Sequence, residues 1–539
     1  MTGLSRRRFV QGAGVAGGAA LAGPVAVGAP AVAAGLEGEE GAESVAVLVR
    51  KGDVRYADLS QGVNLRWVGT PDAIRVVSSA DQVVQVVQEA VDKGQGIAVR
   101  SGGHCYEDFV TRPEVRVVID MGRMTSVTFD RTRNAFAVEP GALLGTVYRQ
   151  LYKGWGVTLP GGTCPTVGAG GHVVGGGYGP LGRMHGLIVD HLYAVEVVVV
   201  DSAGRAQKVV ATREASDPNR DLWWGHTGAG GGNFGVITRY WFRSPGATGT
   251  DPSALLPKPP SEVVVSDVSW SWDGMTEAAF TRLLKNFSQW HENNSADGSP
   301  YAGLFSHLKP QHRSAGSFQM STQLDASVPD ADKLLDAYLA AVNEGTGLKY
   351  RVNDRKKVPW LYNVTQWAGW VGGTTARWKA KSAYLRKTFP DAQLQAFWKH
   401  LTRTDYDNPT GLVVLASYGG RINKVAPADT AVPQRDSVVK LLYVSLWNDA
   451  TQDAKHLQWI REFYRDVYAA TGGVPRPDAV NDGAFINYVD ADMGDTSINT
   501  SGVPWHQLYF KDNYARLQAV KAKWDPKNVF THSMAVRKP

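Results

Sequence analysis

The chain has 539 residues and a formal net charge of +6 at pH 7, and this length is sufficient for two or three domains. Hydrophobic residues make up 43% and charged residues 20%, which is typical of a globular protein, and no stretch is long and apolar enough to indicate a membrane span. Three arginines lie in an N-terminal segment that we expect to be removed, and their loss leaves +3. That charge is too small to indicate nucleic acid as a partner.

The N-terminus is typical of an export signal. Arginines at residues 6–8 precede a weakly apolar run rich in glycine and alanine, which ends at a small-residue motif at residues 31–33. The pattern predicts a twin-arginine signal peptide over residues 1–34 and therefore a secreted protein. A disordered basic tail is the alternative.

The first pattern after this signal is a strand–helix–strand unit. Residues 74–77 form a short apolar run, and Ser79 can cap a helix over residues 80–93. The apolar residues at helical spacing in that helix are Val83, Val84, Val87 and Ala90. A second strand over residues 97–100 runs directly into a glycine turn, so the unit ends where a ligand can approach the backbone.

Further strands follow along the chain. We expect them over residues 115–121, 135–139 and 192–200, with a hairpin-like turn at residues 202–204, and another strand begins at Gly235.

The composition changes near residue 245. Residues 252–260 are rich in proline and predict a linker, and the chain beyond them is rich in Trp and Tyr. An alternating run at residues 441–446 and amphipathic stretches at residues 454–470 and 514–523 indicate a mixture of sheet and helix.

Three glycine-rich segments carry the candidate chemistry. Residues 100–104 read Arg-Ser-Gly-Gly-His, which is a plausible seat for an anion but is not G-x-G-x-x-G and does not indicate a Rossmann NAD site. Residues 161–179 contain nine glycines. Because so many glycines disfavour a helix, we expect a long loop against a flat, charged cofactor. Residues 228–238 offer a third close approach.

The two cysteines, Cys105 and Cys164, allow several interpretations. Export would permit a disulfide between them, and two buried thiols are equally possible. Cys164 lies inside the second glycine segment, where backbone donors or a nearby cation would promote its thiolate, so it is also poised to react with a ligand. No group of His, Cys and carboxylate residues has the spacing of a metal site.

Together these motifs resemble the FAD-linked oxidases of the berberine bridge enzyme type. The resemblance is carried by residues 100–104, by the cysteine motif at residues 161–172 and by Gly-Gly-Asn-Phe-Gly at residues 231–235, and residues 513–530 are similar to the closing segment of that family. The resemblance covers nearly the whole chain after the signal. The family includes bacterial oxidases that modify secondary metabolites.

The resemblance implies an α+β fold of two domains. A FAD-binding domain would cover residues 45–245. A substrate domain with an antiparallel sheet covered by helices would cover residues 246–500, and residues 501–539 would return to the FAD domain.

It also implies FAD bound through two covalent bonds, from the flavin 8α-methyl carbon to His104 and from C6 to Cys164. Two anchors fix the ring without a clamp over it, which leaves room for a bulky substrate, and the protein then places and tunes the ring. The other residues expected to bind the cofactor are Arg100, Ser101, Gly102, Gly103, Thr166, Val167, Gly168, Gly170, Gly171, His172, Gly176, Gly177, Asn233, Gly235, Val236, Ile237 and Asn513.

For catalysis, the resemblance assigns the general base to Tyr488 and its activating partner to Tyr384. Tyr178, which lies beside the flavin loop, is a further active-site candidate, and packing on the ring is the alternative for it. Oxidising an alcohol needs a base for the hydroxyl proton while the carbon-bound hydrogen leaves as hydride. A neutral tyrosine is a poor base, so a neighbour must lower its pKa.

We therefore expect an oxidase that acts on a hydroxyl group of a sugar or secondary metabolite, with O2 reoxidising the flavin to give H2O2. Its partners would be this small molecule and O2, without nucleic acid, membrane or metal, and it would be a monomer or a homodimer. An oxidative cyclase that forms a C–C bond would carry the same motifs. A non-catalytic protein that keeps FAD only to hold its fold is a third reading, which the two intact tyrosines disfavour.

Overall fold

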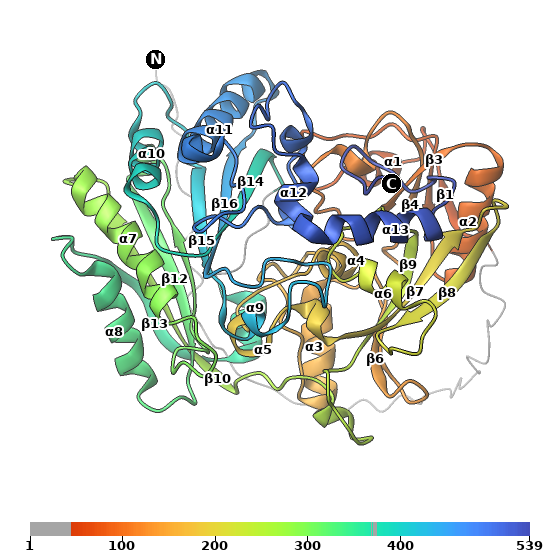
Figure 1. Cartoon of the computed structure of the whole chain (residues 1–539), viewed down its shortest axis with the longest axis horizontal. Helices are drawn as coiled ribbons and strands as arrows, with labels where there is room; N and C mark the ends of the chain where they lie inside the picture. The colour runs from red at the N-terminus through yellow and green to blue at the C-terminus, as the bar shows by residue number, and fades with distance from the viewer. Residues whose placement is uncertain (1–44, 368, 370–374) are drawn as a thin grey trace, which may run out of the picture. The chain divides into compact units, whose positions relative to one another are not determined.

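Three β-sheets organise the part of the chain that the structure describes (Figure 1). The structure is a computed structural model, and it describes residues 45–367, 369 and 375–539. The predicted signal peptide lies outside the described residues. Residues 45–539 pack as one compact unit, and the domain limits predicted within it stay predictions.

A four-stranded sheet contains the predicted strand–helix–strand unit. Its order is β1-β2-β4-β3. The strands are β1 (Val47–Val49), β2 (Ala73–Val76), β3 (Gly96–Arg100) and β4 (Val115–Asp120), and the short helix α1 (Tyr56–Leu59) precedes β2. β2 and β3 both run parallel to β4, which lies between them. Because parallel strands need a crossover connection, α2 (Ala80–Asp92) links β2 to β3.

Helix α2 begins where the sequence predicted. The Ser79 side chain accepts a hydrogen bond of 3.3 Å from the Gln82 backbone N–H, which satisfies one of the otherwise unpaired donors of the first turn. The buried residues of the helix are Gln82, Val83, Val86, Val87 and Ala90. Val84, which we expected on this face, is only half-buried, because residues 83, 86, 87 and 90 share one side at 3.6 residues per turn.

A five-stranded antiparallel sheet follows, in the order β5-β6-β9-β7-β8. Its strands are β5 (Val127–Asp130), β6 (Ala135–Val138), β7 (Leu192–Val200), β8 (Ala206–Thr212) and β9 (Val236–Phe242). The predicted turn at residues 202–204 joins β7 to β8, and Gly204 adopts a φ of +88° there, which suits glycine.

Residues 161–179 do not form the uninterrupted loop that we expected. The helices of this part of the chain are α3 (Leu144–Trp155), α4 (Ala169–Val174), α5 (Gly182–His185) and α6 (Arg220–Gly225), so α4 lies inside the glycine-rich segment. Ala169, Val173 and Val174 are buried in the core. Burial of this face outweighs the low helix propensity of the two glycines in α4.

The third sheet has seven antiparallel strands in the order β13-β10-β12-β11-β15-β16-β14. They are β10 (Glu262–Ser271), β11 (Phe305–Lys309), β12 (Ser317–Asp325), β13 (Arg351–Pro359), β14 (Arg377–Leu385), β15 (Gly411–Ser417) and β16 (Val439–Trp447). Figure 1 shows helices α7 (Glu277–Asn293), α8 (Ala331–Asn343), α10 (Asp391–Thr402) and α11 (Asp453–Val467) against one face of this sheet, while α9 (Trp360–Gln366) follows β13. The predicted α+β fold with a helix-covered antiparallel sheet is confirmed.

The C-terminal segment contains α12 (Trp505–Phe510) and α13 (Tyr514–Trp524), and α13 packs against α6. A fully buried ammonium anchors it. Lys521 Nζ lies 2.7 Å from the Asp525 carboxylate and donates to the Asn233 carbonyl at 2.8 Å and to that of Phe530 at 2.5 Å. None of the helices in the described residues is long and apolar enough to cross a membrane.

Removing the Lys521 ammonium should destabilise the fold. Lys521→Met leaves the Asp525 carboxylate buried without its counter-charge, which typically costs about 3–5 kcal/mol. The free energy of unfolding in urea measures the effect, with Lys523→Met, an exposed lysine on the same helix, as the control. Equal small losses in the two variants would contradict the anchoring role of Lys521.

Candidate active site

A cavity of about 650 Å³ lies between the glycine-rich segments and the seven-stranded sheet. Its wall includes the turn after β3, residues around α4, the turn before β9, and residues of β11, β14, β15 and β16. Residues 485–489 and 530–532 complete it. This volume is in the range of cofactor and substrate sites.

The two residues predicted to bond the flavin lie in this cavity and share one neighbour. His104 Nε2 is 3.1 Å from the Thr166 hydroxyl oxygen, and Cys164 Sγ is 3.2 Å from the same oxygen. Burial lowers the pKa of the His104 imidazole, which favours its neutral, nucleophilic form. The two cysteines of the chain, both described, form no disulfide.

The glycines of the first two segments allow the turns themselves to meet. A Cβ added at Gly102 would lie 2.3 Å from the Gly168 nitrogen, and one at Gly168 would lie 2.0 Å from the Ser101 hydroxyl oxygen. We expected glycine here for close approach to a cofactor. The structure adds a second reason, because the two backbones can touch only if neither residue carries a side chain.

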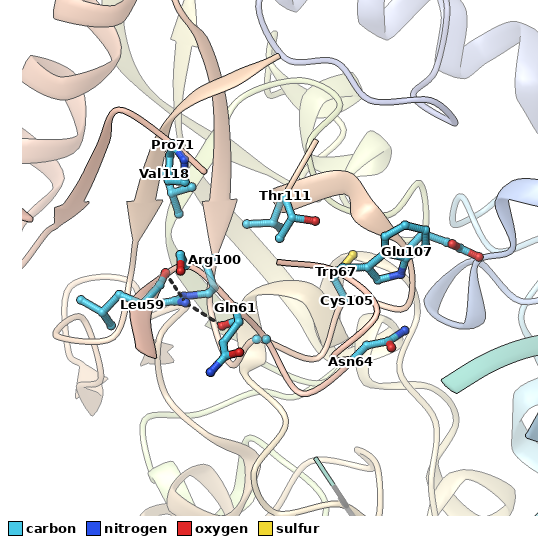
Figure 2. A pocket seen from close by; sticks show the side chains of 14 residues that line it. Leu59, Gln61, Asn64, Trp67, Pro71, Arg100, Cys105, Glu107, Thr111 and Val118 are labelled. Atoms are coloured by element: carbon cyan, nitrogen blue, oxygen red, sulfur yellow. Dashed lines mark hydrogen bonds between the residues drawn. The ribbon is translucent and has the colours of Figure 1, made fainter. Parts of the chain in front are cut away.

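Arg100 is held by protein groups behind this turn, at a second and smaller cavity (Figure 2). Its guanidinium donates to the Leu59 and Gln61 carbonyls at 2.6 and 3.0 Å and pairs with Asp120 at 2.5 Å. The side chain therefore fixes the turn. Cys105 also lines the small cavity, where burial raises the pKa of its thiol to about 11.

Most of the residues predicted to bind the cofactor line the large cavity. They are Arg100, Ser101, Gly102, Gly103, His104, Cys164, Val167, Gly168, Gly170, Gly171, His172, Gly235, Val236 and Ile237. Those outside its lining are Thr166, Gly176, Gly177, Asn233 and Asn513, although the Thr166 hydroxyl reaches both residues predicted to bond the flavin.

Asn233 and Asn513 hold backbone rather than face the cavity. The Asn233 amide nitrogen donates to the Ala229 and Gly230 carbonyls at 3.0 and 3.1 Å, and its oxygen accepts from the Val536 N–H at 2.8 Å. It thereby ties the turn before β9 to the C-terminus. Asn513 donates to two carbonyls of the loop that precedes β16, at 2.8 and 3.1 Å.

His172 organises the loop around α4. Its Nε2 accepts a hydrogen bond of 3.1 Å from the Gly162 N–H, and burial lowers the pKa of the imidazole to about 3, so the ring is neutral. A Cβ at Gly177 would lie 2.0 Å from this nitrogen, which explains why residue 177 is glycine. The Asn487 side chain donates to the His172 carbonyl at 2.9 Å and so joins this loop to the segment that carries Tyr488.

The structure brings Tyr178, rather than Tyr384, against Tyr488. The Tyr178 and Tyr488 hydroxyl oxygens are 3.4 Å apart, and both side chains line the cavity. Tyr384 packs edge-on against Tyr418, with ring centroids 5.2 Å apart, and Tyr418 is its neighbour rather than the Tyr488 hydroxyl. Tyr178, and not Tyr384, is therefore the direct neighbour of the Tyr488 hydroxyl.

Lys440 on β16 is a residue that the sequence reasoning missed. Its ammonium is buried and lies 3.4 Å from the Tyr178 ring centroid, 2.9 Å from that of Phe485, 4.8 Å from that of Tyr488 and 5.4 Å from that of Tyr384. It has no hydrogen-bond partner among the described residues. A cation over aromatic faces is stabilised by their quadrupoles, but far less than by a carboxylate.

Burial shifts the pKa of the phenols and of this lysine in opposite directions. It raises the pKa of Tyr488, raises that of Tyr178 well above its usual value, and lowers that of Lys440 well below its usual value. Each neutral form is favoured because the charged form loses its hydration. A phenolate and the Lys440 ammonium would offset each other's burial, so the two charged forms would favour each other.

Tyr106 is the second missed residue. Its ring stacks on that of Tyr488, with centroids 5.2 Å apart and planes 17° apart, and it follows His104 by two positions. The signal that could have identified Lys440 is strand alternation, because it lies on the same side of β16 as Leu442, Val444 and Leu446, which line the cavity. A lysine in phase with such an apolar row is unusual.

The chemistry of this wall fits FAD. Glycine-rich turns present backbone N–H groups that can approach an anion closely. His104 and Cys164 offer an imidazole and a thiol near one hydroxyl group. Among the residues that the structure describes, no group of His, Cys, Asp and Glu could hold a metal ion.

Comparisons with known proteins agree with this assignment. The chain matches the family described as "FAD binding domain" over residues 71–209 and the family described as "Berberine and berberine like" over residues 484–537. These two regions contain both predicted attachment residues and Tyr488.

Individual relatives match over nearly the full length. The chain is 51% identical to the aclacinomycin-N/aclacinomycin-A oxidase of Streptomyces galilaeus, over 99% of both chains. It is 33% identical to the hexose oxidase of Chondrus crispus, over 90% of this chain and 94% of that one. The crystal structure of a glycopeptide hexose oxidase complexed with teicoplanin is 50% identical, with a TM-score of 0.88 over 91% of this chain and 99% of that one.

Removing the charge of Lys440 should shift the pH dependence of the site. Lys440→Met keeps most of the length of the side chain but cannot form the ammonium that would offset a phenolate, so the pKa of the phenols should rise. The pH of half-maximal anaerobic flavin reduction should then move upward by about 1–3 units. Lys455→Met, on the exposed surface of α11, is the control, and an unchanged profile in Lys440→Met would contradict this role.

Proposed function

We propose that the protein oxidises a hydroxyl group attached to a secondary metabolite with a large apolar body. The premise is its family, because the chain belongs to the berberine bridge enzyme type of FAD-linked oxidases and is a flavin-dependent oxidase that acts on alcohol groups. The observation that carries the proposal is a shared cavity. Tyr488 and Tyr178 line the same cavity as His104 and Cys164, and Lys440 lies against both phenol rings.

In the proposed reaction Tyr488 takes the proton of the substrate hydroxyl. The neighbouring Tyr178 hydroxyl can donate to the Tyr488 oxygen, and a protonated Lys440 would favour the ionised phenol. FAD, when bound, supplies the two-electron acceptor that takes the carbon-bound hydrogen as hydride. Loss of the O–H proton and of this hydride leaves a carbonyl group on the substrate.

We propose that FAD is held through His104 and Cys164. Both side chains reach the Thr166 hydroxyl, and each lies in a turn whose close backbone packing limits its movement. Two bonds at one end of the flavin would hold the ring without a protein clamp above it. The rest of the cavity is then left to the substrate.

An apolar row on the sheet indicates what kind of substrate fits. Leu442, Val444 and Leu446 line the cavity from one strand, with Trp378 on the neighbouring β14. A strand rises about 3.3 Å per residue, so the row extends for roughly 13 Å from the end near Lys440. A free monosaccharide cannot cover such a row. Two relatives support a substrate with an apolar body, namely the one named as an aclacinomycin oxidase and the one whose structure contains teicoplanin.

We propose O2 as the electron acceptor and hydrogen peroxide as the second product, by analogy with the oxidases that this chain resembles. The export predicted from the N-terminal arginines is also a proposal. It would deliver a folded, flavin-loaded enzyme, because the twin-arginine route transports folded proteins.

If both attachment residues bond FAD, the flavin should survive denaturation. Acid-precipitated protein should be yellow and retain its flavin in the pellet, because a covalent bond is unaffected by unfolding. His104→Ala and Cys164→Ala should each keep one bond, and only the double variant should release FAD. The measurement is flavin absorbance in pellet and supernatant, and free FAD from the unmutated protein would refute the proposal.

The proposed reaction can be tested with a panel of substrates. Glycosylated polycyclic metabolites, glycopeptides and free sugars would be mixed with the enzyme without oxygen, and flavin bleaching followed. The expected result is rapid bleaching by a substrate with an apolar body, with peroxide and a carbonyl product once air is admitted. Bleaching by free sugars alone would contradict the assigned substrate class.

With such a substrate, Tyr488→Phe should slow anaerobic flavin reduction by about 10²–10⁴-fold, the usual contribution of a general base. Tyr178→Phe should cost more than Tyr384→Phe, because only Tyr178 contacts the Tyr488 hydroxyl. Tyr362→Phe, on the surface of α9, is the control. Reduction of Tyr488→Phe at the unmutated rate would assign the base to another residue.

A further inference from the structure

A buried cluster of six charged side chains lies next to the proposed base. Its members are Glu107, Asp490 and Asp492 with Lys379, Lys381 and Arg461. Every side chain in it is at most 6% exposed, except that of Arg461 at 36%. Three negative and three positive charges make the cluster neutral.

Lys379 bridges two chain segments within this cluster. Its ammonium is 2.5 Å from the Glu107 carboxylate and 2.7 Å from the Asp490 carboxylate. Glu107 follows His104 by three positions, and Asp490 follows Tyr488 by two. One ammonium therefore ties the turn that carries a proposed flavin bond to the segment that carries the proposed base.

A second contact strengthens this connection. The Ala491 N–H donates to the same Glu107 oxygen that meets Lys379, at 3.2 Å. Figure 2 shows the Glu107 side chain extending away from the small cavity that Trp67 and Cys105 line. The Glu107 carboxylate therefore points away from the turn that carries it and binds the segment after Tyr488.

The residues beside the bridge are the ones that must be aligned. Tyr106, next to Glu107, stacks on Tyr488. The turn that carries Tyr488 is also held by Ser382 on β14, whose hydroxyl accepts from the Phe485 N–H at 3.0 Å and contacts the Tyr488 carbonyl at 3.4 Å. Lys379, Lys381 and Ser382 all belong to β14, so one strand serves as the common support.

Stability alone does not explain such a cluster. Burying ions costs free energy that their attraction only partly returns, and apolar residues of similar volume are often as stabilising. The arrangement does supply fixed geometry, because a bridging ammonium holds two carboxylates at defined distances. β14 also carries a simple ion pair two residues before Lys379, between Arg377 and Asp453 of α11. That pair connects neither the His104 turn nor the Tyr488 segment.

We propose that Lys379 is a positioning residue, which sets the Tyr488 turn against the His104 turn through Glu107 and Asp490. This inference rests on the proposed function, because it assumes that Tyr488 is the base and that His104 bonds the flavin. Misalignment of a reacting group by about 1 Å can cost about 10²-fold in rate.

The first test removes the whole bridge without leaving an unpaired charge. In Glu107→Gln/Lys379→Met the remaining four charges are still balanced, so the melting temperature should change little. Anaerobic flavin reduction should slow by about 10- to 100-fold, with the dissociation constant of the substrate unchanged. Mass spectrometry of flavin peptides should find fewer chains bonded at His104 and no loss at Cys164.

The second test releases only the arm that leads to the base. Asp490→Asn/Lys381→Met is also charge-balanced and leaves Lys379 paired with Glu107. Reduction should slow as in the first variant, while bonding at His104 stays complete. This variant keeps the proposal open to disproof if the first one fails to fold.

The control is Arg377→Met/Asp453→Asn on the same strand, which should reduce its flavin at close to the unmutated rate. Normal reduction in either folded bridge variant, or an equal loss in the control, would overturn the inference. A normal rate in Tyr488→Phe would instead overturn the proposed base. The two failures are therefore distinguishable.

Discussion

Gly102 and Gly168 approach each other so closely that neither position can carry a Cβ without displacing backbone or the Ser101 hydroxyl. The turn after β3 and the segment before α4 come from distant parts of the sequence, and this contact aligns them. His104 follows one glycine, and Cys164 precedes the other. Their convergence on the Thr166 hydroxyl is a consequence of that packing. A side chain at either glycine would separate the two turns and with them the proposed attachment points.

The buried charged groups near the site have two different kinds of surroundings. In the cluster around Lys379 each ammonium meets at least two carboxylates, so the charges are compensated and their positions are fixed. Lys440 lies against aromatic faces with no hydrogen-bond partner among the described residues, and burial lowers its pKa. A compensated charge resists a change of protonation, whereas an uncompensated one responds to any new negative charge nearby. The first arrangement suits support, and the second suits proton transfer.

Local sequence was sufficient for the features that depend on local backbone. The strand–helix–strand unit, the Ser79 cap and the glycine-rich turns could be predicted, because glycine content and apolar spacing reflect backbone requirements directly. The helix α4 was missed since its stability comes from tertiary burial of Ala169, Val173 and Val174. Arg100 and Asn513 were assigned to the cofactor by motif. Arg100 lines the large cavity while its guanidinium binds protein groups, and the Asn513 side chain holds the loop before β16.

Lys440, Tyr106 and Lys379 could not be found in the same way, because their roles depend on which distant strands pair. Lys440 lies opposite Tyr384 in the register between β16 and β14, and no sequence motif specifies that register. The cluster further requires the segment after Tyr488 to reach β14. Motif resemblance identified the residues expected to touch the flavin, whereas the residues expected to hold and tune the base required the full topology.

The position of β14 explains why the proposed base lies on a short 3-10 turn (Ile486–Tyr488) rather than on a strand. β14 is the last strand of its sheet, and an exposed edge strand has unpaired backbone donors and acceptors that must be covered. The segment before Tyr488 covers it, with the Tyr384 N–H donating to the Gly483 carbonyl at 2.9 Å and the Asp482 N–H to the Tyr384 carbonyl at 3.0 Å. The chain then turns over the edge at Tyr488 and is held beyond it by Asp490. A phenol on a regular strand could face only one side of the sheet, but a turn at the edge can reach across to the flavin-binding turns.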